Sequence, residues 1–160
     1  DVDGSAGQLM RRWLDLLTES ETLGFDSLWA NEHHFDAYGG IIPSPPTLLA
    51  ALSQRTQRAR LGTSIVVLPL HSPIEIAEQL AMVDLMSNGR VEFGIGRGFV
   101  EFDYERLHIP RDDSNERMRE QLEVILKAWS GQAFEHKGRF YQYDNLEVWT
   151  PPEHRKPPPL

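Results

Sequence analysis

Hydrophobic residues follow two periodicities along the chain. Four segments place apolar residues three or four positions apart, which is the spacing of one helical face. Three shorter segments are mostly apolar and rich in β-branched or aromatic residues, as buried strands are. The helical segments are residues 8–23, 44–57, 72–88 and 114–129, and the strand-like segments are residues 25–30, 61–68 and 91–95. The two kinds of element alternate, which predicts an α/β fold.

Residues that start and stop helices stand at the expected boundaries. Ser72 is followed by Pro73 and, three residues after the serine, by Glu75, which is the spacing of a capping box. Gly24 and Gly89 are positioned to end helices. The strand-like segments begin about one βαβ unit apart, so we expect parallel strands joined by helical crossovers.

Two regions depart from this alternation. Residues 99–113 carry polar and aromatic side chains with no helix directly after the preceding strand, and we expect a long functional loop there. Residues 134–143 are a predicted hairpin around Lys137-Gly138, with residues 146–149 as a candidate third strand. Three parallel strands with helices on one side close neither a barrel nor a two-sided sheet. We therefore expect further strands on both sides of residues 1–160, which form one partial domain.

Composition and charge narrow the functional classes. The chain has 160 residues, 40% of them hydrophobic, and Trp13 and Trp129 lie on apolar helical faces where we expect them to pack in the core. A net charge of -8 with scattered basic residues argues against nucleic acid or an anionic membrane as a partner. The lack of cysteine excludes disulfides and thiolate metal sites. With no membrane-length apolar stretch and no signal-peptide pattern, we expect a soluble cytoplasmic protein.

Ionisable residues gather where the strand-like segments end, which is where parallel α/β proteins carry their chemistry. The first such segment runs into Glu32-His33-His34. Neighbouring strand residues point to opposite faces, so we expect one histidine in a site, suited to proton transfer, and the other in a structural role. For Glu32 we favour acceptance of backbone N–H groups over orientation of a histidine. His71 and His108 lie in separate segments, which argues against a metal site.

Glycines dominate the end of the last parallel strand, in the run Gly94-Ile95-Gly96-Arg97-Gly98. No helix opens directly after the run, so it does not match a dinucleotide-binding fingerprint. Glycines at a strand end do let a flat ring or another backbone approach closely. Arg97 either binds a phosphate or carboxylate of a ligand or forms a structural ion pair with Glu92, Glu101 or Asp103.

Hydroxyl and aromatic residues near these strand ends each allow two interpretations. Thr63 and Ser64 interrupt an otherwise apolar strand, either as ordinary strand residues or because they face a polar ligand inside a barrel. Phe99, Phe102 and Tyr104 either line an apolar substrate pocket or anchor their own loop. The residues alone do not separate these alternatives.

Three ordered motifs make the chain resemble the bacterial luciferase-like, flavin-dependent monooxygenase family. They are residues 24–29 leading into Glu32-His33-His34-Phe35, residues 61–69, and residues 86–90 leading into residues 94–98. Members of this family fold as (β/α)8 TIM barrels. The resemblance therefore implies that residues 1–160 cover barrel strands two to four with their helices and a β-hairpin insertion, with strand one before them and strands five to eight after them.

The resemblance also implies roles for individual residues. His33 matches an active-site histidine that acts as a general acid or base, and His34 is its structural neighbour. The Ser64-Ile65 peptide matches a non-proline cis peptide against the flavin ring, and Arg97 matches an arginine near the flavin phosphate. Gly96 stands where luciferase itself has a reactive cysteine beside the ring, so the resemblance predicts flavin chemistry without predicting light emission.

The implied activity is that of a monooxygenase subunit. It would use reduced FMN, supplied by a separate flavin reductase, and O2 to oxygenate a small organic substrate. One alternative within the fold is a deazaflavin (F420)-dependent hydride transferase, and another is a non-catalytic flavin-binding or partner subunit. A metal-dependent barrel hydrolase would need ligands at several strand ends, and only the first strand offers an obvious one. The resemblance further implies a homo- or heterodimer.

Overall fold

A computed structural model describes residues 5–35, 40–153 and 157–160. Its helices are α1 (Ala6–Thr22), α2 (Pro45–Ser53), α3 (Pro73–Ser87), α4 (Glu101–Arg106) and α5 (Ser114–Ala128), with a 3-10 turn η1 (Leu68–Leu70). Its strands are β1 (Ser27–Ala30), β2 (Arg60–Thr63), β3 (Val66–Val67), β4 (Val91–Glu92), β5 (Ile95–Gly96), β6 (Phe134–Lys137) and β7 (Gln142–Leu146). Within the described residues, no helix is both long enough and apolar enough to cross a bilayer.

The parallel strands form two short ladders. β1, β2 and β4 pair in that order, with Leu61 opposite both Leu28 and Val91, and β3 pairs with β5. The predicted strands 61–68 and 91–95 are therefore each divided in two. The sequence pattern did not predict the divisions, which fall at Ser64-Ile65 and at Phe93-Gly94. All the pairings between these five strands are parallel, as the spacing of the segments predicted.

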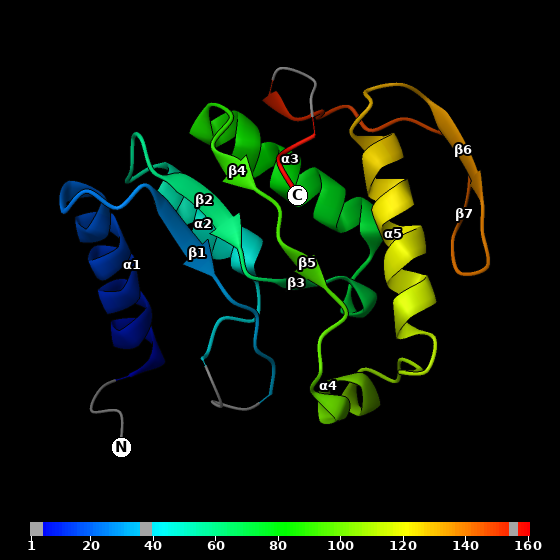
Figure 1. Cartoon of the computed structure of the whole chain (residues 1–160), viewed down its shortest axis with the longest axis horizontal. Helices are drawn as coiled ribbons and strands as arrows, with labels where there is room; N and C mark the ends of the chain where they lie inside the picture. Colours follow the sequence, from blue (N-terminus) through cyan, green and yellow to red (C-terminus); the bar gives the residue numbers. More distant parts are fainter. Residues whose placement is uncertain (1–4, 36–39, 154–156) are drawn as a thin grey trace.

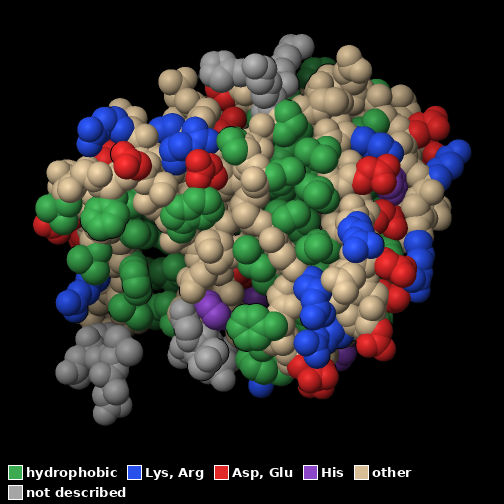
Figure 2. Space-filling model, in the orientation of Figure 1, with side chains coloured by type: hydrophobic (Ala, Val, Ile, Leu, Met, Phe, Trp, Pro, Cys, Tyr) green, Lys and Arg blue, Asp and Glu red, His purple; other side chains and the backbone are tan. Residues whose placement is uncertain are grey.

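The two faces of the sheet have different surroundings. Leu28 and Ala30 are buried, whereas Trp29 between them is 47% exposed. Alternation along the strand places Trp29 on the face opposite to the helical layer. Gly62 is its neighbour on β2, and any side chain at position 62 would overlap the Trp29 ring. Figure 2 shows hydrophobic side chains lying over the strands in this view. In a closed (β/α)8 barrel this face lines the interior.

Helices α2 and α3 lie behind the strands, and α5 stands beside them against α3, so that the three helices form one layer (Figure 1). Leu49 on α2, Leu80 on α3 and Ile125 on α5 are fully buried in it. Trp129, just after α5, is also fully buried and donates its Nε1–H to the Ala77 carbonyl at 2.8 Å, which confirms its packing role. Trp13 on α1 is 43% exposed, so its predicted place in the core was wrong. The reason is that α1 packs at the edge of the layer and has no buried residue.

Capping residues and prolines set the helix boundaries, although the capping box is not at the helix where the sequence predicted it. Helix α3 begins at Pro73 as predicted, although Ser72 makes no side-chain capping bond and the expected capping box is absent. Proline at the first helical position, with its fixed φ, is enough to start this helix. A capping box forms instead at α1, where Ser5 and Gln8 each accept the other's backbone N–H. Asn88 ends α3 with a left-handed φ of 60°.

The region 99–113 contains a helix, so the prediction of a loop without one was wrong. α4 is short and is held by its aromatic residues. Tyr104 is 2% exposed and donates its hydroxyl to the Arg97 carbonyl, and the Arg106 guanidinium lies 5.3 Å from the Phe102 ring centroid. These contacts depend on the folded strand ends, which local periodicity does not contain.

The predicted hairpin is confirmed. β6 and β7 pair antiparallel, and the Gly138 N–H closes the turn on the Tyr141 carbonyl at 3.0 Å. Residues 147–149 form no strand, so the candidate third strand was wrong; Val148 is instead buried in the core. Glu120 of α5 holds the hairpin by accepting the backbone N–H groups of residues 139–141.

Two interactions outside the strands join the layers. The Arg90 guanidinium donates five hydrogen bonds, to Ser53, to two oxygens of Thr56, to Ala59 and to Ser87, at 2.7–3.1 Å. The Phe93 N–H, between β4 and β5, donates to the Pro159 carbonyl at 2.7 Å. The last described segment therefore lies beside the β4–β5 edge of the sheet.

Candidate active site

A cleft of about 230 Å³ lies at the carboxyl ends of the parallel strands. One wall follows β1, a second consists of the connection from β2 to β3, and α4 with the residues before it forms a third. The lining residues are Asn31, Glu32, His33, Ser64, Ile65, Val67, Leu70, Gly98, Phe99, Val100, Asp103 and Tyr104. The strand-end position predicted from the sequence is thus the position of a cleft.

The Ser64–Ile65 peptide bond is cis, as the family resemblance implied. It separates β2 from β3, and both of its residues line the cleft. Gly96 lies against this segment, because a side chain at position 96 would overlap the Ile65 side chain. A Cβ at position 98 would come within 2.7 Å of Val67 Cγ1. The space that these two glycines leave is therefore filled by the adjacent residues of the same wall.

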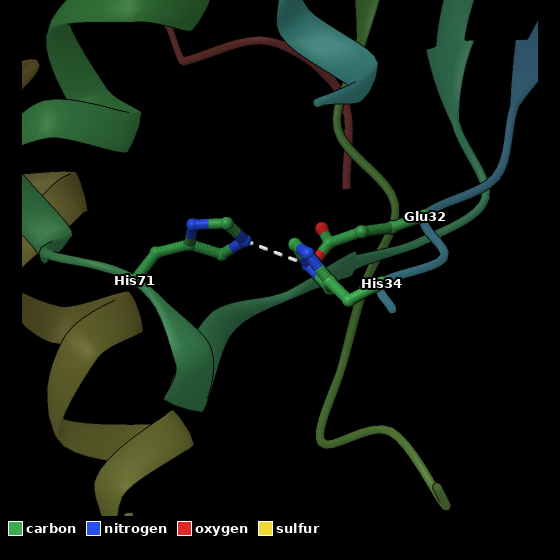
Figure 3. A group of neighbouring side chains, drawn as sticks. All are labelled: Glu32, His34 and His71. Carbon is green, nitrogen blue, oxygen red and sulfur yellow. Dashed lines mark hydrogen bonds and ion pairs between the residues drawn. The ribbon is translucent and has the colours of Figure 1, made fainter. Parts of the chain in front are cut away.

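Glu32 joins three parts of this wall (Figure 3). Its side chain is fully buried, and its Oε1 lies 2.8 Å from His34 Nε2 and 2.8 Å from His71 Nε2. Its Oε2 accepts the Val67 N–H at 3.1 Å, which confirms the expected acceptance of a backbone N–H. It also contacts two histidines, so the less favoured histidine role is present as well, and His71, although it belongs to a separate loop, joins the cluster.

The loop that carries His71 is fixed from the other side by α5. Gln121, fully buried on α5, donates its Nε2–H groups to the Leu68 and His71 carbonyls, both at 2.7 Å. Helix α5, the loop after β3 and the loop after β1 are thereby connected through a continuous series of hydrogen bonds. The signal that would have predicted this contact is the position of His71 just after a strand end, the same criterion that identified Glu32.

The electrostatics of the cluster favour an ion pair. Burial raises the pKa of Glu32, but the hydrogen bonds from His34, His71 and Val67 outweigh it and bring the pKa below its ordinary value. The hydrogen bond to Glu32 raises the pKa of His34, against a smaller opposing effect of burial. A negative Glu32 beside a positively charged His34 is therefore the favoured state at mildly acid pH.

The same three side chains offer atoms that could hold a cation. The two ring nitrogens and a Glu32 oxygen lie within 4.8 Å of one another. Both nitrogens, however, are at hydrogen-bond distance from a single oxygen, and because a carboxylate only accepts, each Nε2 acts as a donor. The cluster as it stands is a hydrogen-bonded one.

His33 and His34 point to different surroundings, as the strand geometry predicted for neighbouring residues. His34 turns to Glu32, while His33 lines the cleft. The backbone of His33 is held by its N–H, which donates to the Ile42 carbonyl at 2.9 Å. Gly40 lies beside the His33 ring, where an added Cβ would be 3.2 Å from Cδ2. The imidazole is thus held at the wall of the cleft.

Arg97 lies outside the lining of the cleft. Its side chain is exposed and, within residues 5–35, 40–153 and 157–160, forms no hydrogen bond or ion pair. Of the structural partners that the sequence allowed, Glu92 binds Arg60 at 2.6 Å and Glu101 lies 3.7 Å from Arg111. The guanidinium is therefore available to an anionic ligand group.

The hydroxyl and aromatic residues divide between the two interpretations that the sequence left open. Thr63 is fully buried and donates its Oγ1–H to the Gly94 carbonyl at 2.8 Å, which is a structural role. Ser64 lines the cleft. Tyr104 anchors α4 and also lines the cleft, while Phe99 is 72% exposed at its rim.

Asp103 is a cleft residue that sequence reasoning missed as such. The sequence suggested it only as an ion-pair partner of Arg97, yet it lines the cleft and is 7% exposed. The available signal was the position of this acid between two aromatic residues, Phe102 and Tyr104. Aromatic side chains tend to be buried, so an acid between them is expected to be buried as well.

Comparison with known proteins agrees with this geometry. The model of the luciferase-like monooxygenase family matches residues 1–160. The oxygenase component of the flavin-dependent trigonelline monooxygenase of Acinetobacter baylyi is 35% identical over 156 residues, covering 96% of this chain and 42% of the relative. The monooxygenase RslO1 of Streptomyces bottropensis superposes with a TM-score of 0.91 at 34% identity, over 98% of this chain and 47% of that one.

A third structure extends the likeness of fold. The oxygenating constituent of 3,6-diketocamphane monooxygenase of Pseudomonas putida, solved with FMN, has a TM-score of 0.87 at 23% identity, over 98% of this chain and 47% of that one. The chain thus spans less than half the length of these three proteins. Its parallel strands and helices form part of a TIM barrel, which confirms the expected fold class. The chain belongs to the luciferase-like monooxygenase family.

Proposed function

We propose that the polypeptide carrying this chain is the oxygenase component of a two-component flavin-dependent monooxygenase. It binds reduced FMN delivered by a separate reductase and uses O2 to oxygenate a small organic substrate. The observation that carries the proposal is the strand-end cleft, whose lining includes both the Ser64–Ile65 segment and His33. A relative named as an oxygenase component supports the two-component arrangement, and a fold neighbour solved with FMN supports the cofactor.

The residues present fit a flavin. Ile65, Val67 and Val100 give the cleft an apolar lining suited to a planar ring, and the exposed Arg97 guanidinium can bind a phosphate outside it. A buried Asp103 oxygen without a partner offers a polar contact. When bound, the flavin supplies the redox chemistry that activates O2.

The protein residues then have the tasks of holding, shielding and proton transfer. The Ser64–Ile65 segment forms a wall that Glu32 holds from behind through the Val67 N–H. The apolar residues exclude water from the reacting groups. His33 exchanges a proton at its imidazole with the bound reactants, a role for which imidazole is suited near neutral pH.

The test is an anaerobic titration of reduced FMN, with reduced F420 in parallel, into the full-length polypeptide. We expect micromolar FMN binding that weakens about tenfold in Arg97→Ala, as for loss of a hydrogen bond to a charged group. Arg12→Ala, which removes an exposed arginine of α1, is the matched control. His33→Ala is expected to bind FMN and to lose oxygenation.

Other outcomes point to other functions. Preference for F420 would assign hydride transfer on the same fold. FMN binding in a wild-type protein that oxygenates nothing would indicate a partner subunit. No binding of either cofactor, together with one tightly held metal ion per chain in the purified protein, would replace the flavin proposal with a metal-dependent one. Dimer formation stays a prediction, to be checked by light scattering.

A further inference from the structure

Asp103 is a buried carboxylate in the wall of the cleft, and one of its oxygens has no partner. It lies in the first turn of α4 and lines the same cleft as His33 and Ser64. Its Oδ1 is shielded from solvent and accepts no hydrogen bond from any group in the described part of the chain. The residue as a whole is 7% exposed, so water has little access to the carboxylate.

Two basic groups near Asp103 are engaged elsewhere. Arg106, one helical turn further along α4, places its guanidinium over two rings, 5.6 Å from the Phe35 centroid and 5.3 Å from the Phe102 centroid. His34 directs its Nε2 to Glu32 at 2.8 Å. Asp103 forms no ion pair with either of them. Within the described part of the chain, the Asp103 charge is opposed only at longer range, by His34, His33 and Arg106.

This arrangement is costly unless a ligand completes it. A buried acceptor without a partner loses its hydration and gains nothing in return, so most such groups in folded proteins are paired. Burial raises the pKa of Asp103, an effect that His34 opposes and the Glu32 carboxylate reinforces. Residues that lower the stability of the free protein and lie in a cleft are typical of binding sites, where the ligand supplies the missing partner.

We propose that Asp103 is a ligand-binding residue of the cleft, whose Oδ1 accepts a hydrogen bond from an N–H or O–H group of the bound flavin. The inference rests on the proposed function, because it takes the cleft to be the flavin site. The donor is either a ring N–H or a hydroxyl of the ribityl chain. A carboxylate acceptor makes the bond charge-assisted and therefore stronger than one to an amide.

Two measurements on the full-length polypeptide test this. The first is the dissociation constant of reduced FMN for wild type, Asp103→Asn and Asp103→Ala, and the second is urea unfolding of the same proteins without ligand. Glu105→Gln, which neutralises an exposed acid on the same helix, is the control. We expect FMN affinity to fall about tenfold in Asp103→Ala and less in Asp103→Asn, which keeps an acceptor oxygen. The ligand-free Asp103→Asn protein should be at least as stable as wild type.

Lumiflavin, which has the ring system but no ribityl chain, distinguishes the two donors. A loss of affinity for both FMN and lumiflavin identifies the ring, and a loss for FMN alone identifies the ribityl chain. Unchanged FMN affinity with lower stability in Asp103→Asn would overturn the inference and leave Asp103 as a structural acid at the start of α4. A wild-type protein that binds no flavin would instead refute the proposed function.

Discussion

Glu32 is the residue whose replacement tests most directly how the site is built. Its carboxylate has no solvent exposure and accepts hydrogen bonds from His34 and His71 at 2.8 Å and from the Val67 N–H at 3.1 Å. Glu32→Gln preserves the volume, so the substitution leaves no cavity. One of the two acceptor positions nevertheless becomes an NH2 group, which points either at the Val67 N–H or at two imidazole N–H groups.

The magnitude follows from these contacts. The variant loses one or two hydrogen bonds to a charged group and leaves a buried donor facing a donor, which together cost roughly 2–4 kcal/mol in the free energy of unfolding. A neutral histidine tautomer can accept from the new amide, which limits the loss at one of the two positions. Glu32→Ala removes all three hydrogen bonds and leaves a cavity, so this variant should be less stable than Glu32→Gln.

The assay is urea unfolding of wild type and variants, followed by circular dichroism, with the free energy obtained by linear extrapolation. Asp15→Asn is the control, because Asp15 pairs with Arg55 at 2.9 Å but is 73% exposed, and such pairs contribute about 0.5 kcal/mol or less. A loss in Glu32→Gln as small as in Asp15→Asn would refute the reasoning, since it would mean that the carboxylate does not hold the wall of the cleft.

Three further substitutions have defined outcomes. Because the pKa of His34 is raised, its charged form stabilises the fold below the unfolded value of 6.5 and this contribution is lost as pH rises through the folded pKa. As pH rises from about 6 to about 8, the free energy of unfolding should therefore fall less for His34→Gln than for wild type, measured by urea unfolding at each pH. Gly94→Ala would place a Cβ on the Thr63 carbonyl and should cost about 3 kcal/mol, measured by urea unfolding. Arg90→Lys cannot reproduce five hydrogen bonds and should cost about 2–3 kcal/mol in the same assay.

The elements that local signals determine were the ones predicted well. Hydrophobic spacing predicted α3 and α5, the three parallel strand positions and the hairpin, because each depends on residues close in the sequence. The family motifs predicted the cis peptide at Ser64–Ile65. The start of α3 at Pro73 was correct for a partly different reason, since the neighbouring Ser72 does not cap it.

What sequence reasoning missed depends on contacts between distant segments. His71 reaches Glu32 across 39 positions of the chain, and no spacing rule connects them. α4 forms where Tyr104 can contact the Arg97 carbonyl, which requires the end of β5 to be in place. Trp13 has the helical spacing of a core residue, yet its helix lies at the edge of the layer. Periodicity shows which face is apolar but not what covers it.

Helix α5 makes the hairpin and the cleft mechanically dependent on one another. Glu120 holds the hairpin turn, and the next residue, Gln121, holds the loop that carries His71. A rotation or shift of α5 caused by a changed hairpin would therefore move His71 relative to Glu32 without altering any residue of the cleft. Sequence changes confined to the hairpin, whether in a designed library or in natural variation, would thus alter the surroundings of Glu32 from a distance.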